Sequence, residues 1–103
     1  MDLQELRNEI NDIDSQLQEL FNKRMQISFK VAEYKIANGL PVFQGMRENE
    51  ILDRVSENAP KGLESASRVF FQNIMDISKC RQYQEFFAGS DKIEYNKLDL
   101  TGH

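Results

Sequence analysis

The chain has 103 residues, enough for one domain and too few for two. Its net charge of -4 argues against nucleic acid as a partner, and no run of about 18 apolar residues is present to span a membrane. The lone Cys80 excludes an intrachain disulfide, and no Cys/His cluster has metal-ligand spacing. The N-terminus has no basic leader or apolar signal core, so we expect no export, and the lone cysteine fits a reducing cytoplasm. We expect a soluble protein that uses no metal or cofactor.

A long helix is predicted from Leu3 to about Ala37. Asp2 and Glu5 resemble a capping box at its start, and Asn38-Gly39-Leu40-Pro41 ends it with a glycine cap and a proline. Apolar residues recur along it in alternating steps of three and four, which is typical of a seam that packs against other helices. This seam consists of Leu3, Leu6, Ile10, Ile13, Leu17, Leu20, Ile27, Val31 and Tyr34.

Two shorter helices are predicted after the turn, over about Gln44 to Glu57 and Leu63 to Phe87, separated by a break at Asn58–Gly62. The apolar side of the first contains Met46, Ile51, Leu52 and Val55. The stripe of the second contains Ala66, Phe70, Ile74 and Ile77, with Phe71 and Met75 alongside. We therefore predict an all-α, three-helix domain over residues 1–90 and a flexible tail over residues 91–103.

The length of the first helix predicts the oligomeric state. At about 1.5 Å per residue it is roughly 54 Å long, and two shorter helices cannot cover a seam of that length. We expect an intertwined homodimer in which the long helices of two copies cover each other. The alternative is a long coiled-coil rod, but the third helix and the Pro/Gly breaks favour a chain that folds back into a bundle.

The seam is interrupted by Arg24, at a position where its rhythm requires an apolar residue. A guanidinium is costly to bury unless an anion meets it, so we interpret Arg24 as part of an anion-binding pocket. Lys35 lies close to three turns further on, so the two cations return to nearly the same face and can grip a small dianion. Arg7 lies about 25 Å before Arg24 and cannot easily share a ligand with it on the same helix, but in an intertwined dimer it can reach the partner's pocket.

Polar residues in the shorter helices are further candidates. Ser78 and Gln82 continue the row of Phe71 and Met75 one turn apart. The second helix starts near Gln44, with Arg47 and Glu48 close behind. Each candidate also has a simpler interpretation: arginines near a seam extend to water, Lys35 and Arg47 can be solvated surface, Ser78 and Gln82 can join helices, and Glu48 can favour a helix N-terminus.

In this order and at these separations, the set resembles the all-helical chorismate mutases of the bacterial intertwined-dimer type. The resemblance spans about residues 3–86. The matching stretches are Leu6-Arg7 with Ile10, Ile13 and Asp14; Leu20 to Arg24; Val31 to Lys35; Pro41-Val42; Arg47-Glu48; and Phe71-Gln72 through Ser78 to Gln82.

The resemblance implies the rearrangement of chorismate to prephenate in the biosynthesis of phenylalanine and tyrosine. Arg24, and Arg7 from the other subunit, would each pair with a substrate carboxylate, and Arg47 would support the charge network. Lys35 would contact a carboxylate and the ether oxygen, and Gln82 would donate to that oxygen. Glu48 would accept from the ring hydroxyl, and Ser78 would contact the carboxylate region. The family often has aspartate where this chain has Gln44, so Gln44 is expected only at the edge of the site.

The reaction is an intramolecular pericyclic shift, in which no proton moves and no nucleophile attacks. It needs a site that restrains the substrate and stabilises charge on the ether oxygen, which fits cations and amide donors without histidine or metal. Two alternatives stay open: an isochorismate pyruvate lyase on the same fold, and a non-catalytic helical dimer that binds a ligand or another protein.

Overall fold

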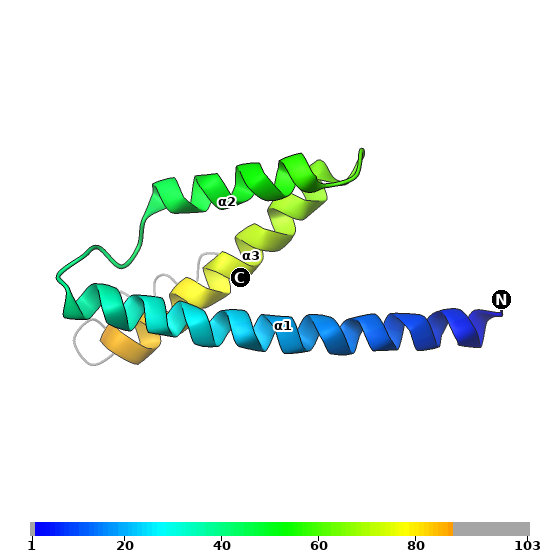
Figure 1. The fold of residues 1–103 in the computed structure, drawn as a ribbon, viewed down its shortest axis with the longest axis horizontal. Helices are drawn as coiled ribbons and strands as arrows, with labels where there is room; N and C mark the ends of the chain where they lie inside the picture. The colour runs from blue at the N-terminus through cyan, green and yellow to red at the C-terminus, as the bar shows by residue number, and fades with distance from the viewer. Residues whose placement is uncertain (1, 88–103) are drawn as a thin grey trace. The chain divides into compact units, whose positions relative to one another are not determined.

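The computed structural model describes residues 2–87, and within that range all regular secondary structure is helical. The helices are α1 (Leu3–Ala37), α2 (Gly45–Asn58) and α3 (Glu64–Phe87) (Figure 1). The predicted all-α class with three helices is thus confirmed, and the predicted ends of the helices are correct to within one residue. The predicted tail over residues 91–103 lies outside the described residues. The chain divides into two compact units, Met1–Tyr34 and Lys35–His103.

Both ends of α1 follow from local chemistry. At the start, the Asp2 carboxylate accepts a hydrogen bond from the backbone N–H of Glu5 at 2.8 Å, so an orphan donor of the first turn is satisfied. At the other end, Gly39 adopts a φ of 66°, and the N–H of Leu40 donates to the carbonyl of Lys35 at 2.8 Å. Because a left-handed conformation costs a residue without Cβ little, glycine stops the helix here as predicted.

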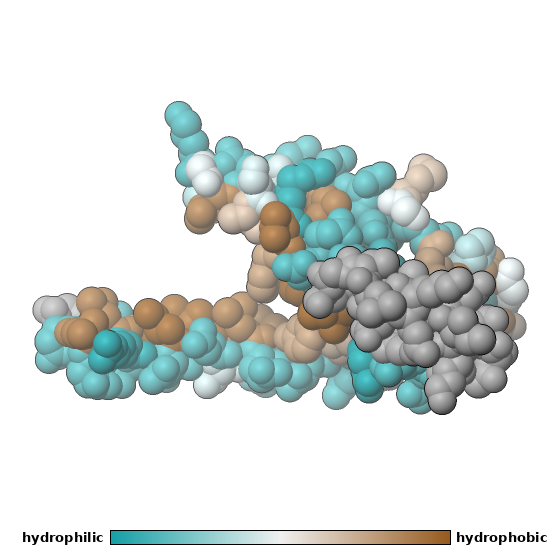
Figure 2. Space-filling model, turned by 180° about the vertical axis from the view of Figure 1, so that it is seen from behind, coloured by the Kyte–Doolittle hydropathy of each residue, from teal (hydrophilic) through white to brown (hydrophobic). Residues whose placement is uncertain are grey.

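The first unit is one continuous stretch of α1 with its apolar seam uncovered. Every seam residue is exposed, and Leu17, in the middle, is 47% exposed. Apolar atoms form a row along this helix in the space-filling view (Figure 2). Contiguous exposed apolar surface of this kind marks a site of association, because single scattered residues are normal and a row is not.

The second unit contains a helical hairpin with its own small core. Ile51 and Leu52 of α2 and Met75 of α3 are buried, and Val55 and Phe71 pack against them. Burial of such side chains stabilises the hairpin by about 1.5–3 kcal/mol each. Gly62, with a φ of 95°, lies in the turn that joins the two helices.

In the hairpin, the buried faces of α2 and α3 differ from the predicted apolar faces in two details. Met46 is 81% exposed and lies outside the core, because it is in the first turn of α2 and the core begins one turn later. On α3 the buried side is the row of Phe71 and Met75, whereas Phe70 and Ile77 of the predicted main stripe are exposed. The third helix therefore has a second apolar side that the hairpin core does not use. None of the helices within residues 2–87 is both long and apolar enough to cross a membrane.

Candidate active site

Two polar side chains are buried on the inner face of α3. Ser78 is 4% exposed and Gln82 is 7% exposed, and they extend the row that begins with Phe71 and Met75. The amide Nε2 of Gln82 donates to the hydroxyl of Ser78 at 3.3 Å. Burying an amide and a hydroxyl is costly, so their placement at the end of an apolar row is a feature to be explained by hydrogen bonding or by a ligand.

An ion pair joins α2 to α3 beside this buried pair. The ammonium of Lys79 lies 2.9 Å from Oε2 of Glu48 and 3.3 Å from Oε1, so it contacts both carboxylate oxygens. Asp76, one turn before Lys79 on α3, lies 3.5 Å from the same ammonium. The side chain of Glu48 is only 23% exposed. The carboxylate is thus held between the two helices by Lys79, the residue that follows Ser78 on α3.

The electrostatic environment of Lys79 favours its charged form. Partial burial by itself lowers the pKa of this ammonium, because it removes water from a charge. The hydrogen bond and the attraction from Glu48, together with Asp76, act in the opposite direction and outweigh it. The pKa of Lys79 therefore lies above its ordinary value of 10.5, and the lysine stays protonated at physiological pH.

Lys35 and Gln44 come together across the turn that links α1 to α2. The ammonium of Lys35 donates to the side-chain oxygen of Gln44 at 3.2 Å and to the carbonyl of Val42 at 3.4 Å. Gln44 is the N-cap residue of α2, and its side chain makes no capping hydrogen bond. The amide oxygen is therefore used to hold Lys35, and the turn fixes the position of this cation.

The three predicted arginines differ in their surroundings. Arg47, in the first turn of α2, is exposed and pairs with Glu50 at 3.3 Å. Arg24 is half-buried and Arg7 is exposed, both on α1. The second unit thus brings together two pairs of the predicted site residues, Lys35 with Gln44 and Ser78 with Gln82.

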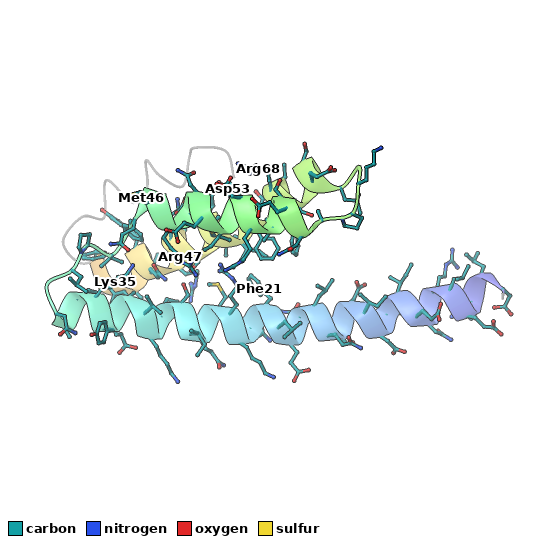
Figure 3. All side chains as sticks on the ribbon, turned by 45° about the horizontal axis from the view of Figure 1, so that its top comes forward. Phe21, Lys35, Met46, Arg47, Asp53 and Arg68 are labelled. Atoms are coloured by element: carbon teal, nitrogen blue, oxygen red, sulfur yellow. The ribbon has the colours of Figure 1, made fainter. Side chains whose placement is uncertain are left out.

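Lys79 was not among the residues predicted from the sequence, although it contacts the predicted site residue Glu48. The available signal was weak: Lys79 follows Ser78, and its acidic partner Glu48 lies 31 residues away on another helix. Arg68 of α3 also has a partner across the hairpin, Asp53 of α2 at 3.2 Å (Figure 3). Within residues 2–87, no group of three or more His, Cys, Asp or Glu side chains is arranged to hold a metal ion.

Comparisons with known proteins identify the family. The family model described as "Chorismate mutase type II" matches residues 6–83, a stretch that contains all eight predicted site residues. No solved structure matches the chain with statistical significance.

Three curated relatives are similar in sequence. The chain is 28% identical to "4-amino-4-deoxychorismate mutase" of Streptomyces venezuelae over 78% of this chain and 79% of the relative. It is 34% identical to "T-protein" of Haemophilus influenzae over 98% of this chain, but spans only 25% of that protein. It is 39% identical to "Monofunctional chorismate mutase" of Enterobacter agglomerans over 66% of this chain and 39% of that protein. On the strength of the family match, the predicted resemblance is confirmed and the chain belongs to the chorismate mutase type II family.

Proposed function

We propose that this chain catalyses the rearrangement of chorismate to prephenate, as an isomerase of the cytoplasm that needs no cofactor. The observation that carries the proposal is the family match over residues 6–83, which includes every residue to which the sequence analysis gave a role. The buried polar pair on α3 and the fixed lysine at the α1–α2 turn support it, because both provide donors at defined positions.

In the proposed mechanism the cations restrain the substrate. Arg24 and the partner subunit's Arg7 each hold one carboxylate, and Arg47 supports the charge network. Bidentate contacts between arginine and a carboxylate fix orientation as well as position. Holding the enolpyruvyl side chain over the ring removes conformational freedom before the reaction, which is worth up to about 7–11 kcal/mol of the barrier in favourable cases.

Lys35 and Gln82 stabilise the negative charge that develops on the ether oxygen as the C–O bond breaks. Fixed donors in a site without bulk water do this well because they need no reorganisation during the reaction. Ser78, bonded to Gln82, orients that amide and contacts the carboxylate region. Because an amide does not titrate, we expect a nearly flat rate profile over about pH 5.5–8; a steep fall with rising pH would contradict this role of Gln82.

The proposed enzyme is an intertwined homodimer with shared sites. The nine exposed seam residues of α1 support this, since a second copy of the same helix is a complementary cover for them. In this dimer, the second copy also supplies the partner subunit's Arg7 to the site.

The direct test is to follow chorismate consumption and product formation by absorbance and chromatography. Formation of prephenate supports the proposal. Release of pyruvate from isochorismate, without prephenate from chorismate, would identify the lyase instead. Binding of a bicyclic transition-state mimic without turnover of either substrate would identify a non-catalytic binding module.

The Streptomyces relative suggests a second candidate substrate. Its name specifies 4-amino-4-deoxychorismate, in which an amino group replaces the ring hydroxyl of chorismate. The same rearrangement of that compound on this chain is the second candidate function. The residue proposed to meet that ring position is Glu48, so discrimination between the two substrates depends on its surroundings.

A further inference from the structure

The carboxylate of Glu48 is shared between two partners in the proposed enzyme. On the protein side, Lys79 contacts both of its oxygens, at 2.9 and 3.3 Å. On the substrate side, each carboxylate oxygen retains further lone pairs that can accept a hydrogen bond. The ammonium thus neutralises the charge of Glu48 without using up its capacity to accept.

We propose that Lys79 is a specificity-determining residue. Because it pairs with Glu48, it favours a neutral hydroxyl at the ring position of the substrate that Glu48 meets, and it disfavours a cationic amino group there. This inference rests on the proposed function, in which Glu48 meets the ring hydroxyl. Lys79 does not need to touch the substrate, since it acts through the carboxylate that it holds.

The physical reason is the sign of the charges. An unpaired glutamate attracts an alkylammonium strongly and accepts from a hydroxyl more weakly. With Lys79 on both oxygens, an incoming ammonium meets an ion pair, and it is repelled by the lysine as well as attracted by the glutamate. A hydroxyl carries no net charge, so the same lysine costs it little.

The surroundings keep this arrangement in place. Lys79 belongs to α3 and Glu48 to α2, so their pairing depends on the packed hairpin and not on one helix alone. Asp76 supports Lys79 from its own helix, and is itself held by a hydrogen bond from Gln72 at 3.0 Å. The attraction from both carboxylates raises the pKa of Lys79, so the repelling charge is present throughout the neutral pH range.

The test compares kcat/KM for chorismate and for 4-amino-4-deoxychorismate in the wild type and in Lys79→Met, which keeps much of the apolar stem. We expect the wild type to prefer chorismate. In Lys79→Met, the ratio of kcat/KM for 4-amino-4-deoxychorismate to kcat/KM for chorismate should rise by about tenfold. Lys79→Arg, which keeps the charge, should restore the wild-type ratio. Both substrates are measured on one preparation, so partial unfolding of a variant leaves the ratio unchanged.

The matched control is Arg68→Met, which breaks a second ion pair between α3 and α2 and leaves Glu48 untouched. It should leave the ratio as it is. The proposal is overturned if the ratio in Lys79→Met stays within about threefold of wild type, if Arg68→Met changes it equally, or if the wild type prefers the amino substrate. If the wild type converts neither substrate, it is the proposed function that fails, and this inference fails with it.

Discussion

The α1 seam and the α2–α3 hairpin solve the same packing problem in different ways. The hairpin buries Ile51, Leu52 and Met75 within one chain, so each helix is the cover of the other. The seam of α1 repeats apolar residues over many turns, yet all nine are exposed in the single chain. The hairpin thus covers its own apolar residues within one chain, whereas the seam of α1 stays exposed in it.

The candidate site contains two kinds of residue, some on the hairpin and some on α1. Glu48 pairs with Lys79, and Gln82 donates to Ser78, so these side chains of the hairpin are held before any substrate arrives. Arg7 and Arg24 lie on the helix whose apolar side is uncovered. We therefore expect substitutions on α1 to act through assembly as well as through chemistry, and those on the hairpin to act locally.

The largest effect is expected from Leu17→Glu, which places a carboxylate in the middle of the seam. If a second copy covers this seam, burying that charge is too costly and the dimer dissociates. Sedimentation should then show a monomer at micromolar concentration, with lower helix content by circular dichroism and no activity.

Gln18→Glu is the control for this substitution, because it adds the same charge to the side of α1 turned away from the seam. It should remain dimeric. A wild-type protein that sediments as a monomer would refute the assembly outright.

The next largest effect concerns the cations. Replacing Arg24 or Lys35 with alanine should lower kcat/KM by at least about a hundredfold, the scale for loss of one preorganised donor. Gln44→Ala removes one of the two acceptors of the Lys35 ammonium and leaves the Val42 carbonyl in place, so it should cost much less. A Lys35→Ala enzyme with near-normal activity would contradict the mechanism.

Mixing two inactive variants tests whether the site is shared. In a heterodimer of Arg7→Ala with Arg24→Ala, one site has both arginines and the other has neither. Random exchange of subunits should therefore restore about a quarter of wild-type activity. An inactive mixture in which subunit exchange has been demonstrated would place both arginines in the same subunit's site or outside it.

Helix ends and caps could be predicted from the sequence because they depend on neighbours in the chain. Asp2 and Gly39 act within a few residues of themselves, and both behave as predicted. The side of α3 that packs against α2 could not be predicted from the sequence as reliably as the helix ends. Its apolar residues occupy two sides, and only the partner helix decides that Phe71 and Met75 are inside while Phe70 and Ile77 are exposed.

The same limit applies to the candidate site. The row of Ser78 and Gln82 follows from helical periodicity, so their proximity could be read from the sequence. The contact between Lys79 and Glu48 could not, since it joins residues 31 positions apart on different helices. Many lysines and glutamates in the chain are equally plausible pairs until the hairpin brings two of them together.

A smaller effect is expected in the core of the hairpin. Met75→Ala leaves a cavity among Ile51, Leu52 and Phe71 and should lower the free energy of unfolding by about 2–3 kcal/mol, near the lower end for such truncations because the core is small. Ile77→Ala is the matched control, because it truncates an exposed apolar residue on the other side of α3. Chemical denaturation with the dimer concentration held constant measures both. A larger loss from Ile77→Ala would show that a partner subunit covers the second side of α3.

The smallest effect is the contribution of Lys79 to stability. The pair with Glu48 is partly solvated, so Lys79→Met should lower the free energy of unfolding by only about 0.5–1 kcal/mol at neutral pH. Because the pKa of Lys79 is raised in the folded state, its contribution is fully present below the ordinary value of 10.5 and is lost as the pH rises through the higher folded value. The difference in stability between wild type and Lys79→Met should therefore stay constant from pH 7 to about pH 10 and shrink above that. A difference that instead disappeared between pH 7 and about pH 9 would show that the lysine loses its proton early, and that the ion pair with Glu48 does not persist in solution.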